Sequence, residues 1–311
     1  MKKIFLSLVS VTCLIVNISG CSKTNETKEL TIFHAGSLAK PFEDLSAAFE
    51  KKHPGVKTLR EASGSVTAAR KISDLHKPAD IIGSADYLVI QNLLMPNHTD
   101  FLYKFATNEM AIMYSPHSKY AKELTAQNWT DILLQEGVKI GRSDPNTDPC
   151  GYRTLITWQL AEKFYAKPGL YEQLLAKTPP QFIRPKETDL LALLETGDLD
   201  YIFIYRSVAE QHNGKFLLLP EQINLKSSQY ADFYKQASVQ IAGEKPGETI
   251  TQVGEPMVYG IAALKNSKNY DLALEFINFV IGPEGQKIMA QNGQPPIVPA
   301  EKVENSVLSL Q

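Results

Sequence analysis

The feature that most constrains the fold is an order that repeats along the chain: a short apolar run, a turn with Gly and Ser, and an amphipathic segment. Residues 30–33 lead to Gly36 and Ser37, after which apolar residues recur at helical spacings of three and four. A second such unit carries Gly64 and Ser65. Strands that alternate with helices indicate an open, mostly parallel α/β sheet. Similar patterns predict helices over residues 152–165 and 190–194, a buried strand over 201–205, and a helix over 272–290 that is interrupted near 282–283.

Two strand-like segments of similar apolar composition, residues 110–114 and 257–262, lie far apart in the sequence. A second set of strands and helices lies between them. The length of 311 residues also suits two domains. We therefore predict a first lobe from residues 30–109 plus 206–311 and a second, inserted lobe from residues 110–205. Ligands of open α/β sheets bind beyond the carboxyl ends of the strands, so the predicted site is the cleft between the lobes.

The N-terminus has the pattern of an export signal. Lys2 and Lys3 precede a mostly apolar stretch over residues 5–18, which is typical of a secretory signal peptide. The sequence Ile-Ser-Gly-Cys that ends at Cys21 resembles the bacterial lipoprotein box, in which the cysteine becomes the lipidated first residue. We expect residues 1–20 to be the signal, residues 21–29 to be a polar tether, and the mature protein to be held extracytoplasmically at a membrane.

Composition excludes several classes of function. The chain has 32 Lys and Arg against 34 Asp and Glu, a net charge of −2 that gives no basic footprint for nucleic acid. Removal of the signal leaves a charge of −4 and two cysteines, Cys21 and Cys150, so no disulfide scaffold is expected. No phosphate-binding loop, paired CxxC or HExxH motif is present, and we expect a monomeric non-enzyme without a cofactor.

The residues that could carry chemistry have two interpretations each. Ser37 and Ser65 could simply cap helices after tight Gly turns, or they could donate hydrogen bonds to an oxyanion at two helix N-termini. Asp148 could cap the helix that Pro149 begins. Cys150 next to it could be a buried structural thiol or a nucleophile.

Several motifs, in order, resemble the tungstate/molybdate-binding proteins of ABC importers, in the WtpA-like (ModA/WtpA) branch. The resemblance covers about residues 30–300 and implies a two-lobed type II periplasmic-binding-protein fold that presents an oxyanion to a membrane permease. The matching segments are residues 33–38 (Phe-His-Ala-Gly-Ser-Leu), 62–65 (Ala-Ser-Gly-Ser), 79–87, 146–153 (Asn-Thr-Asp-Pro-Cys-Gly-Tyr-Arg) and 200–205 (Asp-Tyr-Ile-Phe-Ile-Tyr).

The resemblance also implies a set of ligand-binding residues. Hydroxyl donors correspond to Ser37, Ser65 and Tyr205. Two carboxylates, which correspond to Asp148 and Glu187, are implied to bind the tungsten or molybdenum atom directly and to raise its coordination from four to six. The segment before Glu187 is shorter than in other family members, so two nearby acidic residues compete for this role: Asp189 and Glu195.

The chemistry of this arrangement explains how it would select its anion. A carboxylate repels sulfate or phosphate, by about 4 kcal/mol for unit charges ~4 Å apart at an effective dielectric near 20. Tungsten(VI) or molybdenum(VI) can accept two more oxygen ligands, so the same carboxylates favour tungstate and molybdate. The alternatives are a receptor for sulfate or phosphate, a lipid-anchored enzyme with Cys150 as nucleophile, and a membrane-anchored scaffold without a small ligand.

Overall fold

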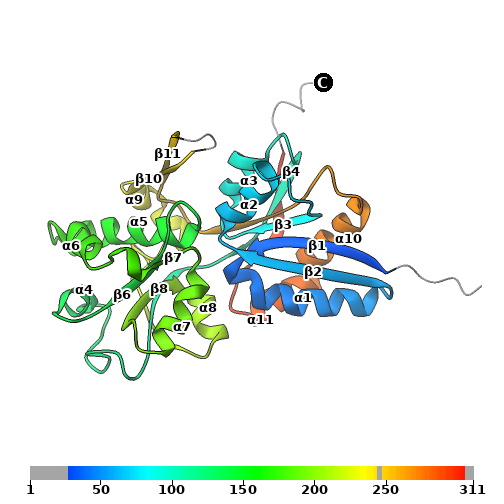
Figure 1. Ribbon diagram of the computed structural model, residues 1–311. Coiled ribbons are helices and arrows are strands. Elements are labelled where there is room, and N and C mark those ends of the chain that lie inside the picture. The colour runs from blue at the N-terminus through cyan, green and yellow to red at the C-terminus, as the bar shows by residue number, and fades with distance from the viewer. Residues whose placement is uncertain (1–26, 244–246, 305–311) are drawn as a thin grey trace, which may run out of the picture.

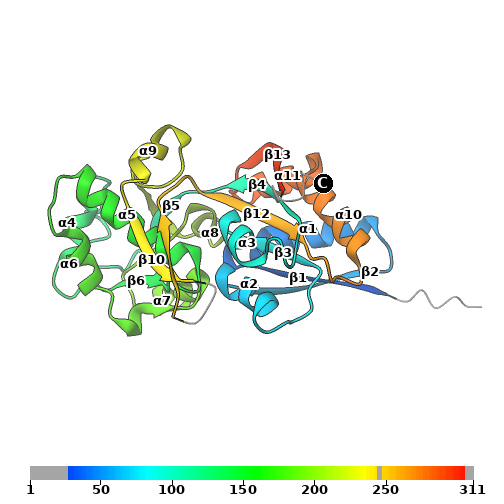
Figure 2. The same cartoon turned by 90° about the horizontal axis from the view of Figure 1, so that it is seen from above.

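The computed structural model describes residues 27–243 and 247–304, which form two lobes side by side (Figures 1 and 2). The predicted signal peptide, the lipidation site Cys21 and most of the tether lie outside the described residues. Strand β1 begins at Lys28, so the last two residues assigned to the tether belong to the first sheet instead. Within the described ranges, no helix is long and apolar enough to cross a membrane.

The first lobe is a mixed six-stranded sheet in the order β13-β4-β12-β3-β1-β2. β1 runs parallel to β2 and β3, whereas β12 pairs antiparallel with β3 and β4. Helices α2 and α3 cover one face of the sheet, and α1 and α10 cover the other (Figure 1). The strands are β1 (Lys28–Ala35), β2 (Val56–Ser63), β3 (Ile81–Ser84), β4 (Phe101–Thr107), β12 (Val258–Ala263) and β13 (Pro296–Glu304), and the helices are α1 (Ala39–Lys52), α2 (Ser65–Ser73), α3 (Tyr87–Leu94), α10 (Tyr270–Ile281) and α11 (Pro283–Gln291).

The second lobe is a five-stranded sheet in the order β7-β6-β8-β5-β9, with a separate hairpin of β10 and β11. β6 is parallel to β7 and β8, and β5 is antiparallel to β8 and β9. Its strands are β5 (Met110–Tyr114), β6 (Ile140–Ser143), β7 (Ile183–Arg184), β8 (Tyr201–Tyr205), β9 (Lys215–Leu218), β10 (Ser238–Ala242) and β11 (Thr249–Val253), and its helices are α4 (Trp129–Leu134), α5 (Pro149–Phe164), α6 (Leu170–Ala176), α7 (Leu190–Glu195), α8 (Arg206–Gln211) and α9 (Ala231–Tyr234).

The two-lobed α/β prediction is confirmed, but the predicted return to the first lobe at residue 206 is wrong. β9 pairs with β5 in the second sheet, and the chain rejoins the first sheet only at β12. The error has a physical cause, because the apolar run over residues 216–219 fits a strand of either sheet, and only its pairing with β5 assigns β9 to the second lobe. The helix broken near residue 282 is confirmed as α10 and α11.

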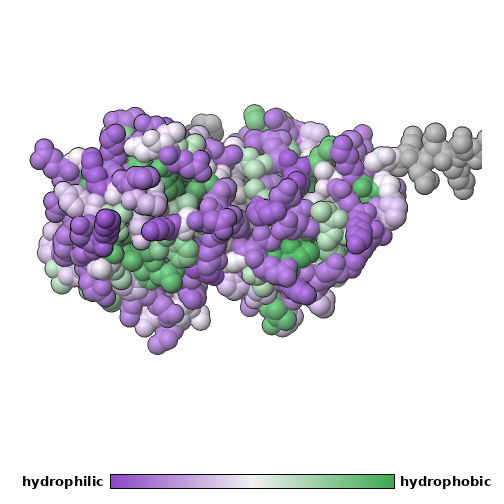
Figure 3. Space-filling view, turned by 90° about the horizontal axis from the view of Figure 1, so that it is seen from below, coloured by the Kyte–Doolittle hydropathy of each residue, from purple (hydrophilic) through white to green (hydrophobic). Residues whose placement is uncertain are grey.

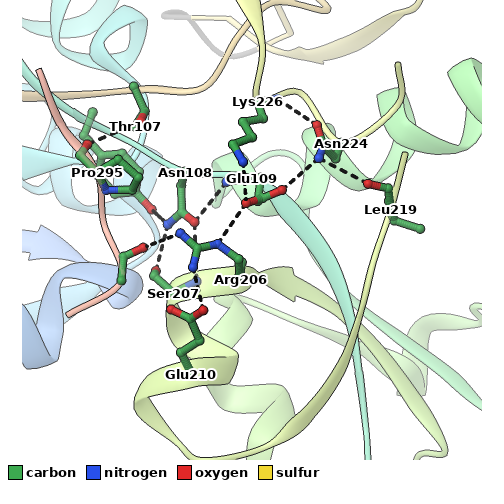
Figure 4. A network of polar contacts seen from close by, with 12 residues as sticks. Thr107, Asn108, Glu109, Arg206, Ser207, Glu210, Leu219, Asn224, Lys226 and Pro295 are labelled. Atoms are coloured by element: carbon green, nitrogen blue, oxygen red, sulfur yellow. Dashed lines mark hydrogen bonds and ion pairs between the residues drawn. The ribbon is translucent and has the colours of Figure 1, made fainter. Parts of the chain in front are cut away.

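Two short segments connect the lobes: residues 108–109 between β4 and β5, and residues 254–257 between β11 and β12. A polar network surrounds the first of them (Figure 4). The buried Glu109 carboxylate forms an ion pair with Arg206, whose Nε lies 2.9 Å from Oε1, and its Oε2 accepts a hydrogen bond from Asn224 Nδ2 at 2.8 Å. Arg206 Nη2 also donates to the carbonyl of Gly293 at 3.0 Å, which joins the second lobe to the first.

Candidate functional site

All five residues predicted to bind the ligand are buried between the lobes, at most 1% exposed. Ser37 lies in a single 3-10 turn, η1 (Gly36–Leu38), directly after β1, and Ser65 begins α2 after β2. Asp148 caps α5, and Tyr205 is the last residue of β8. Glu187 begins a second 3-10 turn, η3 (Glu187–Asp189). On the face shown in Figure 3, the lobes meet without a wide opening between them.

The structure brings the two carboxylates together. The backbone N–H of Glu187 donates to Asp148 Oδ2 at 2.9 Å, and the N–H of Cys150 donates to Asp148 Oδ1 at 3.3 Å. Neither carboxylate oxygen of Glu187 has a hydrogen-bond partner within the described residues. Burial, and then the nearby charge of Asp148, hold the pKa of Glu187 well above its ordinary value, and burial also raises the pKa of Asp148.

The Glu187 side chain faces the first lobe across the cleft. A Cβ atom added to Gly36 would lie 3.0 Å from both carboxylate oxygens of Glu187. A Cβ atom on Gly64 would lie only 2.2 Å from the carbonyl oxygen of Thr147, although Gly64 has a φ of −59° that any residue can adopt. Glycine at position 64 is therefore required by the close approach of the opposite lobe's backbone and not by the turn itself, whereas a larger residue at position 36 would push the Glu187 side chain aside.

The helix-capping interpretation of the two serines is wrong. The N-cap of α2 is Gly64, and neither that helix nor the turn η1 has a side-chain cap. Ser65 Oγ instead accepts a hydrogen bond from the Ala85 N–H at 2.9 Å. Tyr205 Oη likewise accepts from Arg153 Nη1 at 3.0 Å. Because each oxygen is already an acceptor, and neither hydroxyl donates to any described residue, both protons remain available to a ligand.

Three contacts from α5 cross the cleft to the first lobe, a fourth reaches Tyr205 within the second lobe, and none of them was predicted as part of the site. Tyr152 Oη donates to Asp86 Oδ2 at 2.6 Å, and Arg153 Nη2 lies 3.2 Å from the same oxygen. Arg153 Nη1 bridges the Ala85 carbonyl, at 2.7 Å, and the Tyr205 hydroxyl. Arg153 stands between Tyr152 and a largely apolar stretch at the start of the helix predicted over residues 152–165, and a buried arginine needs an acceptor, so this position was the sequence signal that could have revealed the contact.

The competing residues have other roles. Asp189 pairs with Lys186 at 3.3 Å, and Glu195 is exposed. The Cys150 thiol is buried near the Phe203 carbonyl, and burial raises the pKa of Cys150, which is the opposite of what a nucleophile needs. No group of three metal-binding side chains occurs within the described ranges.

A polar site buried between two α/β lobes defines the class of the protein as a two-lobed solute receptor with the type II periplasmic-binding-protein fold. Solved structures agree on the fold. The periplasmic molybdate-binding protein of Azotobacter vinelandii matches with a TM-score of 0.61 at 16% identity, over 85% of this chain and 98% of that one. The sulfate-binding protein SubI of Mycobacterium tuberculosis matches with a TM-score of 0.61 at 14% identity, over 88% of each chain.

The chain belongs to the family of bacterial extracellular solute-binding proteins, which matches it over residues 30–294, and it is a WtpA-like member. The molybdate/tungstate-binding protein WtpA of Thermococcus kodakarensis is 43% identical over 96% of this chain and 94% of its own length. That of Pyrococcus abyssi is 44% identical over 94% of this chain and 93% of its own. An uncharacterized solute-binding protein of Petrotoga mobilis is 55% identical over 89% of this chain and 86% of its own.

Proposed function

We propose that this protein captures tungstate or molybdate between its two lobes and delivers the anion to the permease of an ABC importer. The observation that carries the proposal is the pair of adjacent, buried carboxylates, Asp148 and Glu187, of which Glu187 has unpartnered oxygens facing the hydroxyl-bearing lobe. The names of the WtpA relatives support the choice of ligand.

The hydroxyls and the carboxylates of the cleft would act on different parts of the anion. The hydroxyls of Ser37, Ser65 and Tyr205 donate to its oxygen atoms. The carboxylates of Asp148 and Glu187 approach the metal atom itself and complete a six-coordinate oxygen shell. Sulfate offers no such vacancy, so the same carboxylates repel it.

Closure follows from the division of these groups between the lobes. A ligand that touches both walls binds the closed form better and shifts the equilibrium toward it. The permease then recognises the closed form. The protein acts without chemical conversion of its ligand, as a receptor and not as an enzyme.

Titration calorimetry on the full mature chain tests the proposal, with tungstate, molybdate, sulfate and phosphate as ligands. We expect tungstate and molybdate to bind at least about 100-fold more tightly than sulfate, equivalent to about 2.7 kcal/mol. X-ray absorption of the loaded protein should show six oxygen neighbours at the metal. Comparable affinity for sulfate, or four neighbours only, would contradict the two-carboxylate site.

Membrane attachment is a separate part of the proposal and rests on the lipoprotein-box pattern that ends at Cys21. Acylation of this cysteine would hold the lobes at the outer side of a membrane. The full-length chain should partition into detergent, and Cys21→Ser should move it to the aqueous phase. A Cys21→Ser protein that still partitions into detergent would contradict the anchor.

A further inference from the structure

A buried tyrosine contacts the Ser37 hydroxyl from behind the cleft. Tyr259 lies in β12, and its Oη is 3.0 Å from Ser37 Oγ. The same Oη is 3.0 Å from Nδ2 of Asn108, which is in the segment that connects the two lobes. Asn108 Nδ2 also lies 2.7 Å from the Ser207 hydroxyl of the second lobe, as Figure 4 shows. A continuous chain of hydrogen bonds thus joins the crossing segment to a predicted ligand donor.

The direction of each hydrogen bond in this chain follows from Asn108. Its Oδ1 accepts from the backbone N–H of Glu109 at 3.0 Å and of Ser207 at 3.4 Å, which fixes the orientation of the amide. Nδ2 can only donate, so Tyr259 Oη accepts from it. The tyrosine proton is then directed to Ser37 Oγ. Burial raises the pKa of Tyr259, so the hydroxyl keeps this proton.

The consequence concerns the proton of Ser37. With Oγ accepting from Tyr259, the Ser37 proton points away from the tyrosine and no described residue accepts it. Ser65 and Tyr205 show the same polarity, because each accepts from a group that can only donate. All three hydroxyls are therefore oriented to donate before an anion arrives, which lowers the reorganisation needed on binding.

We propose that Tyr259, oriented by Asn108, is a positioning residue that directs the Ser37 proton toward the bound oxyanion. The proposal rests on the proposed function only in that the ligand is an oxyanion. Tyr259 does not itself touch the ligand. Its whole effect on affinity passes through Ser37.

A double-mutant cycle with tungstate titration tests this dependence. Tyr259→Phe removes the donor and keeps the ring, and we expect the dissociation constant to rise about tenfold. Ser37→Ala is expected to weaken binding more, by about 30-fold, and the double variant should then match Ser37→Ala to within about twofold. Tyr201→Phe is the matched control, because its hydroxyl is bonded to the Lys119 carbonyl in the second lobe, and its affinity should stay unchanged. An unaffected Tyr259→Phe, or losses that multiply in the double variant, would overturn the proposal.

Asn108→Asp provides a second, independent variant if Tyr259→Phe folds poorly. The new oxygen would accept the tyrosine proton and so reverse the polarity of the chain of hydrogen bonds. We expect at least about tenfold weaker binding in the wild-type background and no further loss in the Tyr259→Phe background. An equal loss in both backgrounds would mean that the added charge acts directly on the ligand, and would overturn the positioning role.

The design separates this proposal from the proposed function. If wild-type protein binds sulfate as tightly as tungstate, the metal-selective function fails. The same cycle run with sulfate still tests Tyr259, because a hydroxyl donor acts on the oxygen atoms of either anion.

Discussion

The two walls of the cleft are equally buried but differ in charge. The first-lobe wall carries two neutral hydroxyls, Ser37 and Ser65, each of which already accepts a hydrogen bond from its own lobe. The second-lobe wall carries Asp148 and Glu187, with one hydroxyl, Tyr205, beside them. Neutral donors suit any tetrahedral oxyanion, whereas two carboxylates repel most of them. The difference indicates that one wall supplies general affinity and the other supplies selectivity.

The strongest test of this difference between the walls removes the charge of Glu187 from the second-lobe wall. Glu187→Gln should weaken tungstate binding on the order of 100-fold, because an amide is a poor substitute for the carboxylate that we propose binds the metal directly. The same variant should bind sulfate better, because the charge repulsion is gone and the amide can donate. Titration with both anions measures the two effects.

The matched control for this variant is Asp189→Asn, which changes a carboxylate that is paired with Lys186 outside the buried site. It should leave both affinities unchanged. If Glu187→Gln has no effect and Asp189→Asn has a large one, the residue that gives selectivity is Asp189 and not Glu187.

A change in the first-lobe wall should have a smaller effect on affinity, and the effect should be similar for all oxyanions. Ser37→Ala removes a donor to a charged ligand and should weaken tungstate, molybdate and sulfate alike by about 30-fold, from about 2 kcal/mol. Ser46→Ala is a suitable control, because Ser46 is a buried serine of the same lobe whose hydroxyl has no hydrogen-bond partner among the described residues. Loss of tungstate binding alone would contradict the division between the walls.

The sequence predicted the wall residues unequally well. Asp148 could be placed because a Pro-containing helix start is a local pattern, and the helix indeed begins at Pro149. β8 was predictable because it is an unbroken apolar strand. Both features depend on residues that are close in the sequence, so hydrophobic periodicity and helix-capping rules can predict them.

Contacts between distant segments left no local pattern. Tyr259 meets Ser37 across 222 positions of the chain, and within its own segment it is simply one residue of an apolar strand. Gly64 was expected in a tight turn, yet its role depends on Thr147 in the other lobe. The strand β9 was assigned to the wrong lobe because only its pairing with β5, about a hundred positions earlier in the chain, decides which sheet it joins. In all three cases the role of the residue or strand depends on tertiary contacts with a distant part of the chain.

A third prediction concerns the contacts that hold the walls together. Tyr152→Phe removes the hydrogen bond to Asp86 across the cleft and should favour the open form. All oxyanions should then bind about fivefold more weakly, for about 1 kcal/mol, and small-angle scattering should show a larger radius of gyration without ligand. Tyr165→Phe is the control, because its hydroxyl donates to Ala126 within one lobe. A loss for tungstate alone would mean that Tyr152 acts on the ligand and not on closure.

The smallest expected effect is on the stability of the ligand-free protein as pH changes. Burial raises the pKa of Glu187 above its unfolded value, so its contribution to stability is fully present below the unfolded pKa and is lost as pH rises through the folded pKa. Between pH 5 and pH 8 the wild type should therefore lose melting temperature relative to Glu187→Gln, whose amide does not ionise. Opening of the lobes lets water reach the carboxylate, which limits the difference to about 2–4 °C for a loss of about 1 kcal/mol. Parallel pH dependence in the two proteins would show that Glu187 is solvated in the ligand-free state, and the two walls would then differ in charge only after the ligand has closed them.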